Sequence, residues 1–202
     1  MVSEQLVRRD IVDPRVLAAF GSVPRELFVP GDLAAQAYDD APLPIGSGQT
    51  ISQPYIVALS TDLLALKGDE TVLDVGTGSG YQAAVLAEIA SRVFSVEITA
   101  SLAAEARKRL EELGYRNIET RVGDGYRGWP EKAPFDGIVV AAAAPRIPHA
   151  LVEQLKPRGR MVIPLGGESE IQHLVLVTRR DDSGYDEKRV LPVRFVPLVP
   201  GK

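Results

Sequence analysis

The sequence predicts an α/β fold: a doubly wound, mostly parallel sheet with an antiparallel C-terminal edge and a helical N-terminal extension. Apolar, strand-like segments alternate with helix-like segments between residues 71 and 165, a pattern typical of a parallel sheet covered on both faces. A glycine-rich turn at residues 74–80 joins the first strand of this series to its first helix. Two further strand-like segments near the C-terminus have no helix between them, which indicates an antiparallel pair at the sheet edge.

The first zone, residues 1–67, is expected to be helical with an intervening loop. Asp13 followed by a proline has the residue types of a helix N-cap and first helical position. Residues 41–50 are rich in proline and glycine and predict a loop. An apolar-periodic stretch follows and predicts a second helix, with Ser52 or its neighbour as the N-cap and Pro54 in the first turn.

The second zone, residues 68–165, contains the alternating core. Strands are expected at residues 71–75, 93–96, 118–122, 135–140 and 161–164. Helices are expected at residues 81–90, 100–113 and 151–155. Gly114 stands where the second of these helices should stop.

In the third zone, residues 166–202, the alternation of strand-like and helix-like segments stops. Strands are expected at residues 173–178 and 189–196, joined by the polar turn Asp181-Asp182-Ser183-Gly184. A length of 202 residues suits one domain with a substantial core. The three zones are therefore expected to form a single domain over residues 1–202.

The composition excludes several classes of site. The chain has no cysteine, so disulfides, thiolate zinc sites and a cysteine nucleophile are impossible, and we expect no metal. A formal net charge of -4 argues against nucleic-acid binding, because binders of DNA or RNA usually need a basic face. The strongest basic group, Arg107–Arg109, lies in a helix of alternating charge and is interpreted as a solvated face.

No segment has the features of a targeting or membrane-spanning sequence. Residues 1–10 are charged and lack the apolar core of a secretory signal. No run approaches the roughly 18 apolar residues that a membrane span needs. We therefore expect a cytoplasmic protein with no membrane partner.

The sharpest motif is the glycine loop that follows the first core strand. Its spacing is Gly76-x-Gly78-x-Gly80, with Asp74 two residues before the first glycine. The dinucleotide pattern needs its third glycine where Tyr81 stands, and no Gly-Lys-Ser/Thr follows to make a phosphate loop. The pattern suits a cofactor with an amino-acid end and no phosphate, to which Asp74 can accept a hydrogen bond directly or through water. An ordinary strand-to-helix turn remains the alternative.

Two further acids follow the next two strands. Glu97 ends the second strand, where a carboxylate can accept hydrogen bonds from two ribose hydroxyls. Asp124 lies in Gly-Asp-Gly after the third strand, where an acid commonly faces an adenine amino group. A solvated loop acid and an Asp-Gly turn are the respective alternatives. Acids at three successive strand ends resemble the class I methyltransferase (Rossmann-like) fold.

The loop before the core resembles the signature of one family. Its run Pro-Leu-Pro-Ile-Gly-Ser-Gly-Gln-Thr-Ile-Ser-Gln-Pro, residues 42–54, is similar to that of the protein-L-isoaspartate (D-aspartate) O-methyltransferases. The other segments that carry the resemblance are Val23–Val29, Gly76–Gln82, Gly123–Gly125, Ala133–Asp136 and Val193–Leu198. The resemblance covers nearly the whole chain, in the right order.

The resemblance implies a repair enzyme for damaged proteins. Such enzymes transfer a methyl group from S-adenosylmethionine to the carboxylate of an L-isoaspartyl residue, with D-aspartyl residues as a further candidate substrate, and release S-adenosylhomocysteine. The ester then closes to a succinimide that opens partly to normal aspartate. The partners would be isoaspartyl-containing proteins and peptides, and we expect a monomer.

The resemblance also implies the site residues. Ser52 is the catalytic residue. The cofactor residues are Asp74, Gly76, Thr77, Gly78, Ser79, Gly80, Glu97, Ile98, Asp124 and Gly125. The substrate residues are Thr50, Ile51, Gln53, Val193, Phe195 and Val196.

The chemistry needs little more than positioning. The nucleophile is a carboxylate with an ordinary pKa of about 3.9, so it is ionised at neutral pH and needs no general base. His149 and His173, the two histidines, are interpreted as structural or exposed. Ser52 would orient the carboxylate by a hydrogen bond, although a plain helix cap is favoured from the residue alone. Residues 141–144 are all alanine where the family often has larger residues, which can widen the site's floor or affect packing only.

Two alternative functions stay open at the level of sequence. One is a methyltransferase with another acceptor, such as a small acid or a nucleic acid, because a fold alone does not choose the substrate. The net acidity and the lack of an Asn-Pro-Pro-Tyr element argue against nucleic acid. The other is a non-catalytic cofactor-binding adaptor for modified proteins, which would bind both ligands and release no S-adenosylhomocysteine.

Overall fold

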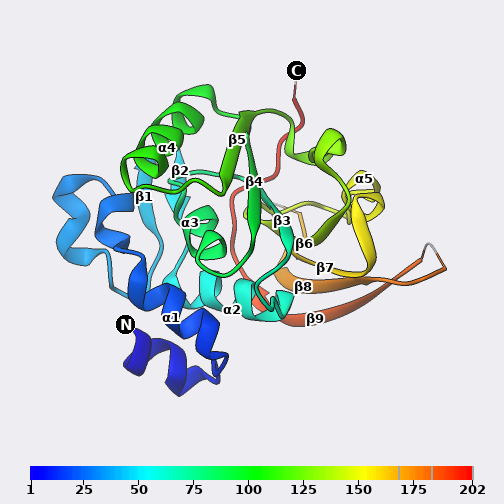
Figure 1. Ribbon diagram of the computed structural model, residues 1–202, viewed down its shortest axis with the longest axis horizontal. Coiled ribbons are helices and arrows are strands. Elements are labelled where there is room, and N and C mark those ends of the chain that lie inside the picture. Colours follow the sequence, from blue (N-terminus) through cyan, green and yellow to red (C-terminus); the bar gives the residue numbers. More distant parts are fainter. Residues whose placement is uncertain (168, 183, 202) are drawn as a thin grey trace.

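The computed structural model describes residues 1–167, 169–182 and 184–201 and contains a seven-stranded sheet (Figure 1). The strand order is β5-β4-β3-β6-β7-β8-β9. These strands are β3 Thr71–Val75, β4 Arg92–Glu97, β5 Ile118–Val122, β6 Phe135–Val140, β7 Leu155–Leu165, β8 Gln172–Arg179 and β9 Tyr185–Val193. The pairs from β5 to β7 are parallel, and β7-β8 and β8-β9 are antiparallel. The predicted mixed sheet with an antiparallel edge is confirmed.

Helices cover both faces of the sheet. They are α1 Pro14–Ser22, α2 Pro54–Leu64, α3 Tyr81–Ala87, α4 Ala100–Glu112 and α5 His149–Glu153. Alternate residues of one strand serve opposite cores: Val72 packs with α1, α2 and α3, whereas Leu73 and Val75 pack with α5. Figure 1 shows α1–α4 gathered on one side and α5 on the other. The sheet is therefore doubly wound, as the alternating pattern predicts.

The N-terminal zone contains more structure than expected. Asp13 is confirmed as the N-cap of α1, because its side chain accepts a hydrogen bond from the Arg15 N–H at 2.8 Å. The predicted loop at residues 41–50 is wrong in part, since it contains an antiparallel hairpin of β1 Leu43–Gly46 and β2 Gln49–Ile51. Short helical turns that the sequence does not predict individually lie in this zone at Val2–Leu6, Val7–Arg9, Arg25–Phe28 and Gly31–Gln36, and in the core zone at Gly125–Arg127 and Pro130–Lys132.

Several predicted boundaries are wrong in the C-terminal half. The expected helix 151–155 begins and ends two residues earlier, because Leu155 already pairs with Phe135 as the start of β7. The last strand ends at Val193 instead of residue 196. The expected turn at residues 181–184 includes Ser183, which lies outside the described residues.

The chain after β9 returns across the carboxyl ends of the parallel strands (Figure 1). Val196 O accepts a hydrogen bond from Ala143 N–H at 2.8 Å, and Leu198 N–H donates to Ala143 O at 2.7 Å. This return places residues from the C-terminal edge beside the glycine loop. None of the helices in the described ranges is long and apolar enough to cross a bilayer.

Candidate active-site cleft

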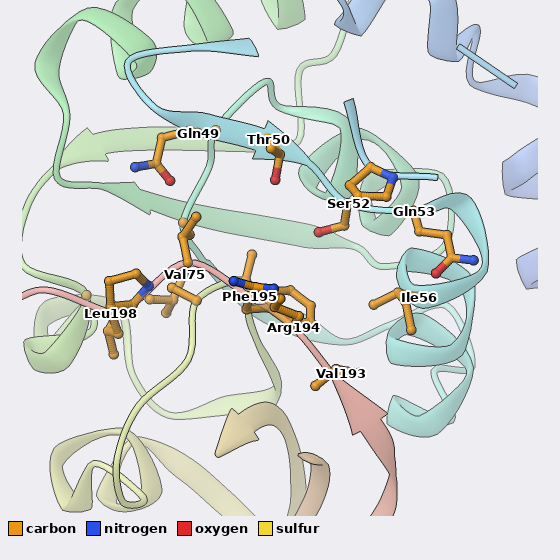
Figure 2. Close-up of a pocket in the computed structure, with 18 of the residues that line it drawn as sticks. Gln49, Thr50, Ser52, Gln53, Ile56, Val75, Val193, Arg194, Phe195 and Leu198 are labelled. Carbon is orange, nitrogen blue, oxygen red and sulfur yellow. The ribbon is translucent and has the colours of Figure 1, made fainter. Parts of the chain in front are cut away.

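A cleft of about 560 Å³ lies beyond the carboxyl ends of β3, β4 and β6. We call it the main cleft. One wall comes from the strand ends and the glycine loop, a second from the segment Gln49–Gln53, and a third from the segment Leu191–Val199. Figure 2 shows Thr50, Ser52 and Gln53 opposite Val193, Arg194 and Phe195. Ligands of open α/β sheets bind at this place, beyond the strand ends.

The glycines of the loop bring backbone to the main cleft. Gly76 and Gly78 line it, with φ of 97° and 51°, and Gly80 with φ of 90° begins α3. Such positive φ values favour glycine because a Cβ atom would be strained there. Gly125 also lines the cleft, and a Cβ on it would lie 2.7 Å from Val75 Cγ1. These positions leave room for a ligand to approach the backbone closely.

Glu97 is the anionic group of this wall. Its side chain is only 6% exposed, and it lines the main cleft beside Ile98. Oε2 accepts a hydrogen bond from Gly78 N–H at 2.9 Å, and Oε1 accepts one from Thr99 N–H at 2.9 Å. Each carboxylate oxygen keeps a further acceptor site. Glu97 can therefore tie the glycine loop to β4 and still accept hydrogen bonds from two hydroxyl groups of a ligand.

Asp74 does not line the main cleft. It is 0% exposed, and its Oδ2 accepts a hydrogen bond from Ser95 Oγ at 2.7 Å, while Ser95 Oγ lies 2.6 Å from Thr77 Oγ1. Its Oδ1 has no hydrogen-bond partner among the described residues. Burial raises the pKa of Asp74 to about 7; the Ser95 hydrogen bond opposes the rise and the Glu97 charge adds to it. The geometry makes Asp74 a support beneath the loop, through Ser95 and Thr77.

This raised pKa predicts a pH dependence of stability. Between the ordinary pKa of 3.8 and about 7, folded Asp74 holds a proton that the unfolded chain has lost. The free energy of unfolding should therefore fall as pH rises through this window, by about 1.4 kcal/mol per unit of pH, and level off above it. Below the window both states are protonated and the contribution is constant.

Asp74→Asn removes this titration while keeping an acceptor for Ser95. We expect the wild type to lose about 2.6 kcal/mol relative to the variant between about pH 5 and about pH 8. Urea unfolding of both proteins without ligand measures the difference, in which the other titrating groups cancel. Parallel pH profiles for the two proteins would mean that Asp74 has an ordinary pKa.

The remaining predicted cofactor residues do not line the main cleft; they are Thr77, Ser79, Gly80 and Asp124. Thr77 and Ser79 line a smaller side cavity of about 40 Å³ next to the main cleft, together with Gly76 and Gly78. Gly80 packs beneath α4, where a Cβ would lie 3.4 Å from Leu110. The Asp124 carboxylate accepts a hydrogen bond from Tyr126 N–H at 2.8 Å and is absent from the cleft lining.

The segment Gln49–Gln53 presents most of its predicted residues. Thr50, Ser52 and Gln53 line the main cleft, whereas Ile51 is buried and reaches only the side cavity. Gln53 is the N-cap residue of α2 and makes no side-chain capping hydrogen bond. Ser52 thus precedes the cap, which contradicts its interpretation as a plain helix cap. In Figure 2 its hydroxyl points into the cleft.

The third wall is held in place by a glutamine that the sequence analysis did not identify. Val193, Phe195 and Val196 all line the main cleft. Gln172 Oε1 accepts a hydrogen bond from Phe195 N–H at 2.6 Å, and Gln172 Nε2 donates to Phe195 O at 3.2 Å. This two-point pair replaces strand pairing after β9 ends, so the expected strand does not continue to residue 196.

Two arginines of the cleft were also missed. Arg194 is exposed on the third wall and lines the cleft. Arg9 lines it from the N-terminal zone, paired with Asp40 at 2.6 Å and stacked 3.4 Å from the Tyr55 ring centroid. A single arginine carries no local sequence signal, and only the folded chain brings these two to the cleft.

The alanine run at residues 141–144 lies partly on the main cleft and partly in the packed core. Ala141 and Ala142 line the main cleft, whereas Ala143 and Ala144 are packing residues that pair with Pro197 and Leu165. The alanine run therefore serves both the floor of the site and its packing.

The two histidines and the basic helix lie outside the main cleft. Neither His149 nor His173 lines it. Arg107 and Lys108 form exposed pairs with glutamates on the same helix. Arg109 corrects the solvated-face interpretation, because it donates to Ser79 O at 2.8 Å.

Comparisons with known proteins agree along the whole chain. A family model described as protein-L-isoaspartate(D-aspartate) O-methyltransferase matches residues 1–202. A protein-L-isoaspartate O-methyltransferase 2 of Marinobacter nauticus is 57% identical over 199 residues, covering 98% of this chain and 91% of the relative. Another of that name from Nitrosococcus oceani is 54% identical, covering 98% and 90%.

Solved structures lead to the same family. A structure named protein-L-isoaspartate O-methyltransferase has a TM-score of 0.87 and 30% identity; the match covers 98% of this chain but 65% of the longer chain. A putative protein-L-isoaspartate O-methyltransferase of Plasmodium falciparum, solved in complex with S-adenosyl-L-homocysteine, has a TM-score of 0.82 and 27% identity. That match covers 98% of this chain and 96% of the other.

Proposed function

Because the chain belongs to the protein-L-isoaspartate(D-aspartate) O-methyltransferase family, we propose that its main cleft divides into a cofactor wall and a peptide wall that meet at Ser52. The reaction is that of the family: an S-adenosylmethionine-dependent transfer of a methyl group to the carboxylate of an L-isoaspartyl residue, which begins the repair of a damaged protein. The observation that carries the division is the Ser52 hydroxyl, which faces a cleft bounded by the glycine loop and the C-terminal segment.

The cofactor wall fits S-adenosylmethionine. The free acceptor sites of Glu97 would bind the two ribose hydroxyls, with Ile98 beside the adenosine. The exposed backbone of Gly76, Gly78 and Gly125 would lie against the ligand. Asp74, Thr77, Ser79, Gly80 and Asp124 would act by shaping these loops. When bound, the cofactor supplies an activated methyl group on a sulfonium cation.

Ser52 would orient the acceptor carboxylate. Its hydroxyl can donate one hydrogen bond to a carboxylate oxygen and leave the other oxygen free for methyl transfer. The carboxylate is already ionised, so the main cleft needs no base near Ser52. Alignment of the carboxylate with the methyl group is then the principal contribution of the residue to the rate.

The peptide wall would hold the damaged segment by its backbone. Val193, Phe195 and Val196 lie on a segment whose other side is tied to Gln172 and Ala143. An extended peptide can pair with such a segment, and Thr50 and Gln53 would flank it, with the buried Ile51 supporting them from behind. Damaged sites differ in sequence, so recognition through backbone suits this substrate class.

We treat residues 1–202 as one methyltransferase domain, since cores on both faces share the central sheet. We propose a monomeric, cytoplasmic enzyme that acts on isoaspartyl proteins and peptides, without nucleic-acid or membrane partners. D-Aspartyl residues are a second candidate substrate.

The deciding experiment uses paired peptides that differ only in one isoaspartyl or aspartyl linkage. Methyl transfer from labelled S-adenosylmethionine should occur with the isoaspartyl peptide and stay at background with the aspartyl peptide. A third peptide with D-aspartate tests the second substrate. Transfer to neither L-peptide, with cofactor binding intact, would require a different acceptor.

A further inference from the structure

A fully buried arginine links the segment Gln49–Gln53 to the helix that follows the glycine loop. Arg25 is 0% exposed and lies in the helical turn Arg25–Phe28, outside the main cleft. Its Nη2 donates a hydrogen bond to Ser52 O at 2.7 Å, and its Nε donates to Ala37 O at 2.7 Å. Its guanidinium carbon lies 4.7 Å from the Tyr81 ring centroid. Arg25 thus touches the serine segment and the first residue of the helix that follows the glycine loop.

Burying the Arg25 cation in this way costs folding free energy. No carboxylate among the described residues forms an ion pair with Arg25, and its acceptors are neutral carbonyl groups. Nη1 is buried without a hydrogen-bond partner in the same part of the chain. Burial lowers the pKa of Arg25, which reflects the cost of keeping a cation there. An unpaired buried charge costs folding free energy, and violations of this kind are expected at functional or strained sites.

The hydrogen bond from Arg25 fixes the backbone of Ser52 itself. Ile51 ends β2, and α2 begins at Pro54, so Ser52 lies in the short link between them. Among the described residues, the bond from Arg25 is the one hydrogen bond that Ser52 makes. The rigid guanidinium plane donates to the two carbonyls from two different nitrogens, Nε and Nη2, a fixed geometry that the single ammonium nitrogen of a lysine does not reproduce.

The contact with Tyr81 ties Arg25 to the start of the helix that follows the glycine loop. Tyr81 is buried and packs edge-on against Phe20 and Phe28, with ring centroids 6.0 Å and 5.4 Å away. It directly follows Gly80, the last glycine of the loop. The position of Tyr81 is therefore tied to that of the cofactor wall.

We infer that Arg25 is a positioning residue that sets the distance between Ser52 and the cofactor wall. The inference rests on the proposed role of Ser52. Arg25 touches neither substrate nor cofactor; it holds the Ser52 backbone so that the hydroxyl meets the acceptor carboxylate in line with the methyl group. Errors of about 1 Å in such alignment can lower a rate about 10²-fold.

The test compares Arg25→Lys and Arg25→Ala with the wild type. Both variants should lower kcat about 30-fold, while the KM for the isoaspartyl peptide and the Kd for S-adenosylhomocysteine change by less than about threefold. Millimolar guanidinium should restore part of the kcat of Arg25→Ala, because it can refill the cavity, and should not help Ser52→Ala. In a double-mutant cycle, Arg25→Lys should change kcat little once Ser52 is alanine.

Arg160→Ala is the matched control. Arg160 is half-buried and donates to Leu63 O at 3.1 Å, at the opposite end of α2. Its loss should lower the melting temperature and leave kcat unchanged. The inference fails if the Arg25 variants keep wild-type kcat, if guanidinium gives no rescue of folded Arg25→Ala, or if neither variant folds with S-adenosylhomocysteine present. Full activity of Ser52→Ala would instead remove the proposed role of Ser52 itself.

Discussion

Replacing Ser52 with alanine is expected to lower kcat for an isoaspartyl peptide by about 10²-fold, through the loss of one hydrogen bond that orients the carboxylate. The fold should be unaffected, because Ser52 is only half-buried and its side chain caps no helix. Initial rates with labelled S-adenosylmethionine, over a range of peptide concentrations, separate kcat from KM. We expect the KM for the peptide to change much less than kcat, since the peptide wall remains.

The size of this effect depends on orientation and not on charge stabilisation. A hydrogen bond to the carboxylate weakens as the oxygen loses its charge to the incoming methyl group. By itself it therefore stabilises the ground state more than the transition state, which would slow the reaction. A large loss of kcat in Ser52→Ala thus requires that alignment contributes more than this cost. Ser52→Thr, which keeps the hydroxyl, should recover part of the rate.

Ser22→Ala is the matched control for Ser52→Ala. Ser22 is exposed on α1, and its hydroxyl donates to Ala18 O at 3.0 Å, away from the main cleft. This variant should keep the wild-type rate. If Ser52→Ala also keeps it, or if the variant raises KM with kcat unchanged, then Ser52 contributes to binding only and the orienting role is wrong.

Local patterns were sufficient for most of the core. The strands at residues 118–122 and 135–140 are predicted without error, because the first alternates β-branched with charged residues and the second ends in the apolar run Ile138–Val140. The start of β7 could not be found in this way. Leu155 pairs with Phe135, and the strand then bends at Arg158, with φ of 65°, before its apolar run begins. That pairing depends on the partner strand, which a local window does not contain.

Side-chain contacts in the candidate site also depend on parts of the chain that a local window does not contain. Strand alternation already separates Asp74 from its neighbours Leu73 and Val75, which face the opposite core. The direction of Asp74 was therefore predictable, whereas its hydrogen bond to Ser95 depends on the register of β3 with β4. Gln172 and Arg25 contact residues 23 and 27 positions away, and these contacts depend on how the chain folds back, which a local window does not contain.

Glu97→Gln is expected to raise the Kd for S-adenosylmethionine by about 10²-fold, because charge-assisted hydrogen bonds contribute about 1.5–3 kcal/mol each. The carboxylate accepts hydrogen bonds on both oxygens from Gly78 N–H and Thr99 N–H. An amide offers one acceptor, so its NH2 group would face one of these two donors. The variant therefore loses acceptor sites for the ribose and also loosens the glycine loop.

The effect is expected on binding because Glu97 belongs to the cofactor wall and not to the segment that carries Ser52. Glu97 lies at the end of β4 on the cofactor wall, whereas the acceptor carboxylate is proposed to meet Ser52 on the segment Gln49–Gln53. At saturating cofactor, kcat should remain within about threefold of the wild type, because uniform binding changes KM and not kcat. Calorimetric titration with S-adenosylhomocysteine, which carries the same ribose, measures the corresponding Kd for the product. Glu119→Gln, an exposed glutamate of β5 paired with Lys132 at 3.0 Å, is the matched control and should bind normally. An unchanged Kd in Glu97→Gln would mean that the ribose is held elsewhere on the wall.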